Sequence, residues 1–283
     1  MPQKVSLTKY PGAKSLQIKY LYQIFTWTDC DTFLDGCAGM GSVSLNAPAQ
    51  FKRIIANDFD PIVHNVWVHF QDAKLFRLLE EKLLETERNL DNHWKAKHIY
   101  AYPGRNTKLD LAWATIVCHR FSRSAMPKNV FQVAGRMRGG QNECDNAWQS
   151  YQKRLPEIHK ATQRVEIWRK DIVKLLLDKN LEKENILYYI DPPYPFNTRK
   201  VKMYHTEWPD SKHQSFLNAV RDHRSKVVIS GRPNEMYEYN LMSWHVAIRE
   251  ITNHMSQRKK KIKNPEVVWT NFEWGQNAST SLE

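Results

Sequence analysis

The sequence has few cysteines and glycines and no long apolar run. Its four cysteines, Cys30, Cys37, Cys118 and Cys144, are scattered and form no CxxC pair, which argues against a zinc knuckle or a disulfide framework. Ten glycines and 13 prolines are too few for a collagen-like or linker-dominated chain. No run approaches the length of a membrane span, and the first 25 residues show no secretory signal. We therefore expect a chain with no membrane association that stays in the cytoplasm.

What the sequence does contain is apolar residues and positive charge. Among its 283 residues 41% are hydrophobic and 12% aromatic, enough for a buried core, so a disordered chain is excluded. Lys and Arg outnumber Asp and Glu by 42 to 30, which gives a formal charge of +12. A basic surplus of this size favours a polyanionic partner, because Lys and Arg displace counterions from phosphates.

Short apolar runs alternate with helical patterns, which predicts an open α/β sheet. We expect strands at 32–35, 53–56, 165–168, 186–190 and 226–229, and an antiparallel edge from 246–248 and 267–269. Helices are expected over 17–27, from 42 onward and over 61–84; between 100 and 146 the helical pattern loosens. The predicted division is a catalytic domain from 1–62 and 164–275, a helical insertion at 63–163 and a disordered tail at 276–283.

A glycine-rich turn follows the first predicted strand. Asp35 and Gly36 end that strand, and Gly39 and Gly41 complete a G-x-x-G-x-G spacing that differs from the dinucleotide fingerprint. No phosphate-binding Lys follows, and an acidic Asp35 suits a ligand that carries a cation, such as an aminoacyl group; an ordinary strand-to-helix turn is the alternative. Asp58 ends the next strand, where a carboxylate can accept hydrogen bonds from ribose hydroxyls.

The strongest motif is Asp191-Pro192-Pro193-Tyr194, directly after the apolar run 186–190. The two prolines fix the backbone and remove two N–H groups. The Asp191 carboxylate and the Pro192 carbonyl can then accept hydrogen bonds from one amino group, while Tyr194 offers a flat face for a stacked base. A structural turn is the alternative, but open α/β sheets bind ligands at this end of a central strand.

Together these motifs resemble the DNA adenine methylases of the Dam type, the D12 class. The resemblance rests on motif order and includes the segments 9–14, 119–121, 131–135, 230–231 and 265–271. It implies a mixed, Rossmann-like sheet of the S-adenosylmethionine-dependent methyltransferases with an inserted, mostly helical DNA-recognition domain. Cys37 follows Gly36 where the family usually has Pro-Phe, Tyr10 stands where Trp is common, and Ala134 where Pro is common.

The resemblance also implies roles for individual residues. S-adenosylmethionine, with no metal, is expected to contact Tyr10, Lys14, Asp35, Gly36, Gly39, Gly41, Asp58, Asp171, Ile172 and Asp191. The expected catalytic residues are Asp191, Pro192 and Tyr194, acting on N6 of an adenine that has flipped out of duplex DNA. A monomer in a bacterial or bacteriophage-infected cell is expected.

Target recognition is expected in the insertion. Between residues 105 and 154 nine basic residues face three acidic ones, and amide side chains lie among them. The expected DNA contacts are Arg120, Arg123, Lys128 and Arg136 in this region. Lys259 and Lys260, in a second basic run at 258–263, are also expected to contact DNA. A basic surface that touches only phosphates is the alternative for many of these.

Two other functions stay open. A cytosine-N4 methyltransferase would keep the fold, but Asp rather than Ser at position 191 disfavours it. A catalytically silent DNA-binding homologue should have lost its cofactor or acceptor residues, whereas Asp58, Asp171, Asp191 and Tyr194 are all present.

Overall fold

The computed structural model describes residues 4–181, 184–198, 203–252 and 263–275. Its centre is a seven-stranded sheet with the order β5-β2-β1-β6-β7-β9-β8. The strands from β5 to β7 are parallel, and β9 and β8 add an antiparallel edge. The strands are β1 (Thr32–Asp35), β2 (Arg53–Asn57), β5 (Glu166–Trp168), β6 (Ile186–Ile190), β7 (Lys226–Gly231), β8 (His245–Thr252) and β9 (Lys263–Thr270). The predicted α/β class and mixed sheet are confirmed.

Helices cover both faces of this sheet. Side chains alternate along a strand, so Phe33 and Tyr189 join one hydrophobic cluster while Leu34 and Tyr188 join the other. The first cluster packs under α1 and α2, and the second under α8, α9 and α10. These helices are α1 (Ile18–Phe25), α2 (Pro61–Gln71), α8 (Ile172–Leu176), α9 (Asp210–Val220) and α10 (Glu235–Asn240). With both faces covered, all five residues of β6 are buried, as a central parallel strand requires.

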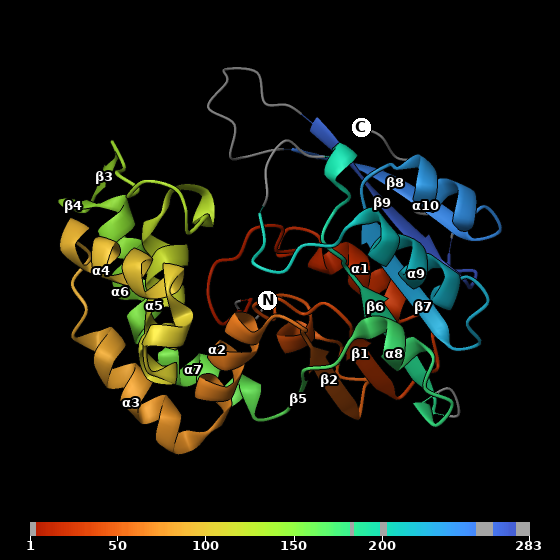
Figure 1. The fold of residues 1–283 in the computed structure, drawn as a ribbon, viewed down its shortest axis with the longest axis horizontal. Coiled ribbons are helices and arrows are strands. Elements are labelled where there is room, and N and C mark those ends of the chain that lie inside the picture. Colours follow the sequence, from red (N-terminus) through yellow and green to blue (C-terminus); the bar gives the residue numbers. More distant parts are fainter. Residues whose placement is uncertain (1–3, 182–183, 199–202, 253–262, 276–283) are drawn as a thin grey trace.

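The helices between α2 and β5 gather beside the sheet, on the left in Figure 1. They are α3 (Ala73–Leu84), α4 (Leu90–Ala101), α5 (Lys108–Phe121), α6 (Glu143–Lys153) and α7 (Leu155–Thr162), and a small hairpin, β3 (Met137–Arg138) with β4 (Gln141–Asn142), precedes α6. Their core is continuous with the sheet cluster through α2. The predicted boundary between residues 62 and 63 falls inside α2, and the domain division stays a prediction; the predicted tail 276–283 lies outside the described residues.

Local structure differs from the sequence prediction at three places. The expected helix over 61–84 is two helices, because the Asp72 carboxylate accepts hydrogen bonds from the Lys74 and Leu75 amides at 2.9 Å and starts α3. The helix expected from residue 42 is a single 3₁₀ turn, Ser44–Asn46, which ends where Ala47 is extended before Pro48. The loose pattern between 100 and 146 conceals α5, which is buried along most of its length.

Candidate active site

A cavity of about 360 Å³ lies at the carboxyl edge of the sheet. Strand β1 has β2 on one side and β6 on the other, so the chain order reverses there, which is where open α/β sheets bind ligands. The residues that line it include all the predicted cofactor contacts except Gly41: Tyr10, Lys14, Asp35, Gly36, Gly39, Asp58, Asp171, Ile172 and Asp191. The fold thus brings widely separated stretches of the sequence to one place.

The glycine turn forms one wall of the cavity. Gly39 has a φ of +51°, and a Cβ atom there would lie 3.0 Å from the ring of Tyr10. Gly41 has a φ of +75°, and its Cβ would lie 2.7 Å from the indole of Trp67, on the core side of the turn. Side chains at either position would be strained and crowded. Glycine therefore lets the turn pack closely between the Tyr10 ring and the core.

Asp58 holds the glycine turn in place. One carboxylate oxygen accepts a hydrogen bond from the Gly39 amide at 2.8 Å, and the other accepts one from the Asp60 amide at 2.9 Å. Burial raises the pKa of Asp58 to about 7. Asp60 caps α2 by accepting a hydrogen bond from the Ile62 amide. The carboxylate predicted to hold the ribose thus shapes the turn as well.

Asp35 lies deep in the same cavity. Its side chain is buried, and its Oδ1 atom has no hydrogen-bond partner among the described residues. Burial, with the Asp191 carboxylate nearby, raises the pKa of Asp35 to about 8. A buried acceptor without a partner is costly unless a ligand satisfies it, so the cavity offers a seat for a donor or cation here.

Asp171 also lines the cavity, at the start of α8. Its carboxylate accepts a hydrogen bond from the Val173 amide at 2.8 Å and forms an ion pair with Lys212. Burial raises the pKa of Asp171, but the bonds from Lys212 and Val173 outweigh burial and lower it. Ile172 is buried behind this carboxylate. Asp171 therefore stays ionised at the mouth of the cavity.

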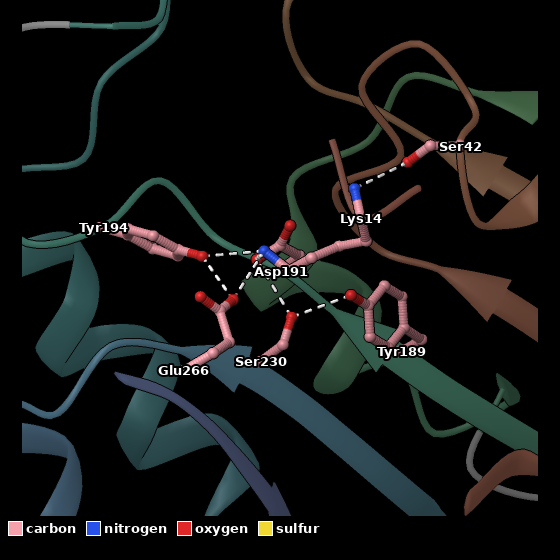
Figure 2. Close-up of polar contacts among 7 residues, drawn as sticks. All are labelled: Lys14, Ser42, Tyr189, Asp191, Tyr194, Ser230 and Glu266. Atoms are coloured by element: carbon pink, nitrogen blue, oxygen red, sulfur yellow. Dashed lines mark hydrogen bonds and ion pairs between the residues drawn. The ribbon is translucent and has the colours of Figure 1, made fainter. Parts of the chain in front are cut away.

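At the end of β6, Asp191 belongs to a polar cluster (Figure 2). Lys14, only 3% exposed, places its Nζ atom 2.7 Å from Asp191 Oδ1, 2.8 Å from the Tyr194 hydroxyl and 2.9 Å from Glu266 Oε1. Burial lowers the pKa of Lys14, but Asp191, Tyr194 and Glu266 raise it well above its ordinary value. Burial raises the pKa of Asp191 to about 6, and Lys14 opposes this. A buried lysine thus pairs with the carboxylate of the strongest motif.

Two residues of the cluster, Ser230 and Glu266, received no role in the sequence analysis. The Ser230 hydroxyl donates to Asp191 Oδ1 at 3.0 Å and lies 2.8 Å from the Tyr189 hydroxyl. Tyr194 is buried, and its hydroxyl donates to Glu266 at 2.6 Å. Pro192 is buried beside Asp191, while Pro193 lines the cavity. Ser230 and Glu266 lie in segments that carry the family resemblance, which was the available signal for them.

The predicted DNA contacts fall into different settings. Arg120 is half-buried, donates to the Thr8 hydroxyl at 3.1 Å and packs 3.7 Å from the centre of the Tyr151 ring. It also lines a second cavity of about 200 Å³ with Lys9, Gln132 and Glu143. Arg123, Lys128 and Arg136 are exposed on the loop between α5 and α6. Lys259 and Lys260 lie outside the described residues.

Two further observations concern the described residues alone. Within them, no helix is both long and apolar enough to cross a bilayer. Nor does any group of three or more His, Cys, Asp and Glu side chains gather there as metal ligands. All four cysteines are free thiols.

Solved structures match this chain at low similarity. The chain resembles a precorrin 8W decarboxylase from Methanobacterium thermoautotrophicum, with 10% identity, a TM-score of 0.41 and 92% of each chain covered. It also resembles the methyltransferase domain of bacterial CtHen1, with 11% identity, a TM-score of 0.37 and coverage of 91% of this chain and 98% of that one. A search of curated proteins found no match.

A family model gives the specific assignment. The model for D12 class N6 adenine-specific DNA methyltransferases matches residues 10–268. The match spans most of the sequence and contains both the glycine turn and the Asp191–Tyr194 motif. The chain therefore belongs to the D12 class of N6 adenine-specific DNA methyltransferases.

Proposed function

We propose that this methyltransferase moves a methyl group from S-adenosylmethionine to N6 of an adenine flipped out of duplex DNA. One observation carries the proposal: the cavity at the sheet edge gathers the predicted cofactor contacts and includes Asp191 in its wall. A cofactor in this cavity and an acceptor base at Asp191 would therefore meet at the end of β6.

The residues of the cavity fit such a cofactor. The unpartnered oxygen of Asp35 suits the ammonium of an aminoacyl group, which would also draw the proton from this carboxyl. Asp58, Asp171 and Ile172 line the cavity. Asp58 would accept hydrogen bonds from ribose hydroxyls and Asp171 from an adenine amino group, with Ile172 as an apolar neighbour. When bound, the cofactor supplies a methyl group that its sulfonium already activates.

The protein's own task is to make a poor nucleophile react. The lone pair of the adenine amino nitrogen is delocalised into the ring. Asp191 and the Pro192 carbonyl would accept its two hydrogens, which favours a pyramidal nitrogen with its lone pair aimed into the cavity. As positive charge develops on this nitrogen, the Asp191 carboxylate stabilises it. Tyr194 would stack on the flipped base and keep it in register.

The charge of the insertion supports duplex DNA as the substrate. Arg123, Lys128 and Arg136 are exposed on one loop, and an adenine inside a duplex cannot reach Asp191 unless it flips. We propose that this loop contacts the DNA beside the target base and that Arg120, in the last turn of α5, supports the loop. The enzyme would act as a monomer where the cell keeps its DNA, in the cytoplasm of a bacterial or phage-infected cell.

The test is a methylation assay with product identification. Purified protein, labelled S-adenosylmethionine and duplex DNA are incubated, and the DNA is digested to nucleosides for mass spectrometry. N6-methyladenine is the expected product. N4-methylcytosine would establish the cytosine enzyme instead, and DNA binding without any methylated nucleoside would establish a silent homologue.

A further inference from the structure

Glu266 lies on the antiparallel strand β9 and is not among the residues that line the cavity, yet it contacts the Asp191 cluster. It is buried, and its Oε1 atom accepts from the Tyr194 hydroxyl at 2.6 Å and from Lys14 Nζ at 2.9 Å. Figure 2 shows its carboxylate beside the Tyr194 hydroxyl and the Lys14 ammonium. Two carboxylates therefore share one buried cation.

The hydrogen-bond count of Lys14 shows how this sharing is arranged. An ammonium has three donors, and Lys14 Nζ has three acceptors within 2.9 Å: Asp191, the Tyr194 hydroxyl and Glu266. Tyr194 accepts from Lys14 and donates to Glu266, so its hydroxyl is held from two sides. Without Glu266, the ammonium would have a single carboxylate partner, Asp191, and the tyrosine hydroxyl would lose its hydrogen bond to this carboxylate.

This matters for the proposed acceptor. In a buried site, a carboxylate that is the sole carboxylate partner of a lysine has most of its charge neutralised. Such a carboxylate accepts further hydrogen bonds weakly. A second carboxylate on the same lysine leaves a net negative charge in the cluster. Asp191 then keeps the charge with which it would meet a developing cation.

We propose that Glu266 is a positioning residue for methyl transfer: it draws part of the charge of Lys14 away from Asp191 and fixes the Tyr194 hydroxyl. It would act through these two residues, since Glu266 itself does not line the cavity. The proposal rests on the proposed function, in which Asp191 accepts from the target amino group.

The charge environment sets the expected pH behaviour. Glu266 raises the pKa of Asp191, so neutralising Glu266 should lower it. The titratable and charged groups that face Asp191 are Lys14, Asp35, Cys37, Tyr189, Tyr194, Tyr237 and Glu266. In the backbone register of the sheet, Glu266 lies opposite Arg249 on β8. Only Glu266 changes in the variant, so a shift of the Asp191 titration reports that contact.

The experiment compares Glu266→Gln with the wild type and with Glu238→Gln, a matched change at an exposed position on α10. Gln keeps an acceptor for Tyr194 and loses the charge. We expect kcat to fall about tenfold, with S-adenosylmethionine affinity unchanged and the acid limb of the pH–rate profile about one unit lower. A wild-type kcat and profile would show that Glu266 is only a hydrogen-bond acceptor and would overturn the proposal.

Two further measurements separate the proposal from the proposed function. Infrared difference spectroscopy follows the Asp191 carboxyl without DNA, assigned by its absence in Asp191→Asn; in Glu266→Gln this titration should move to lower pH. An unmoved titration overturns the charge-sharing proposal even if the wild type methylates DNA, whereas a wild type that makes no N6-methyladenine overturns the proposed function alone. Should Glu266→Gln not fold, Glu266→Asp keeps the charge and should leave the Asp191 titration in place; a shifted titration contradicts the proposal.

Discussion

The carboxyl edge of the sheet, where the Asp191 cluster lies, and the loop between α5 and α6 differ in how exposed their charged side chains are. At the edge, Lys14 is 3% exposed and surrounded by acceptors, and two carboxylates share it. On the loop, Arg123 and Lys128 point into solvent. Buried charges interact strongly and are fixed in place, while exposed ones are screened and mobile. We therefore expect changes at the edge to alter the reaction on every DNA, and changes on the loop to alter which DNA is chosen.

Replacing Asp191 should have the largest effect. Asp191→Ala removes the proposed acceptor, and we expect methyl transfer to fall by about a thousandfold or more, in line with the loss of a preorganised charge at a reacting centre. Cofactor affinity should stay within about threefold by calorimetry, because the rest of the cavity is intact. A variant that keeps near-wild-type turnover would remove Asp191 from the mechanism.

Replacing Asp58 should weaken cofactor binding. We expect Asp58→Ala to cost about 1.5–3 kcal/mol, since charge-assisted bonds to ribose would be lost. The Asp58 carboxylate also accepts hydrogen bonds from the Gly39 and Asp60 amides. Part of the lost binding free energy would therefore come from a loosened glycine turn. The exposed Asp222→Ala serves as the control in calorimetry, and an unchanged affinity in Asp58→Ala would restrict Asp58 to a minor structural role.

Removing the Asp35 carboxyl should change the pH dependence of stability. Its pKa is about 8 in the fold and 3.8 ordinarily, so between these values the folded protein holds a proton that the unfolded chain has released. Stability must therefore fall as pH rises through this window. Asp35→Asn stays neutral, so its Tm should fall less than that of the wild type between pH 5 and pH 8. Parallel curves in scanning calorimetry would contradict the raised pKa.

The same contrast explains how much of the fold could be predicted. Strand β6 is a short apolar run that ends at Asp191, and it was predicted because burial on both faces leaves a continuous apolar pattern. Helix α5 was missed for the same physical reason: it is buried on nearly all sides, so it lacks the amphipathic period by which helices are found. Asp72 was missed as a cap because apolar residues continue on both sides of it.

For the site, motifs predicted which residues gather and not how they pair. Asp35, the glycine turn and Asp58 were predicted because glycine turns and acidic strand ends have fixed places on an α/β sheet. Tyr10, Lys14, Asp171 and Ile172 were expected only from the family resemblance. The contact of Lys14 with Asp191, Tyr194 and Glu266 joins three distant segments, including the antiparallel edge. Nothing in local spacing determines such a meeting; the packing of β9 beside β7 does.

Variants of the loop should have the smallest effect on turnover and the clearest effect on choice of DNA. A residue that bonds a base edge discriminates between sequences, while one on a phosphate weakens binding to all DNA alike. Arg123 lies two residues after the end of α5, and the Asn129 side-chain amide donates to its carbonyl oxygen at 3.0 Å. Its backbone is therefore held, and its exposed side chain projects from a defined place. We expect Arg123→Ala to reduce the preference for a matched over a single-substituted duplex by about 1–3 kcal/mol.

Lys128 is the matched contrast for Arg123 on the same loop, exposed and basic. A lone ammonium is a point charge without the planar fork that reads guanine, so Lys128→Ala should lower the rate on every duplex equally. It should also flatten the salt dependence by about one unit of slope, the value for one lost phosphate contact. Methylation rates on matched and substituted duplexes at two salt concentrations distinguish the two residues. If Arg123→Ala lowers the methylation rate on all duplexes by the same factor, Arg123 contacts phosphate. The base contacts would then come from the second cavity, which Arg120 and Lys9 line.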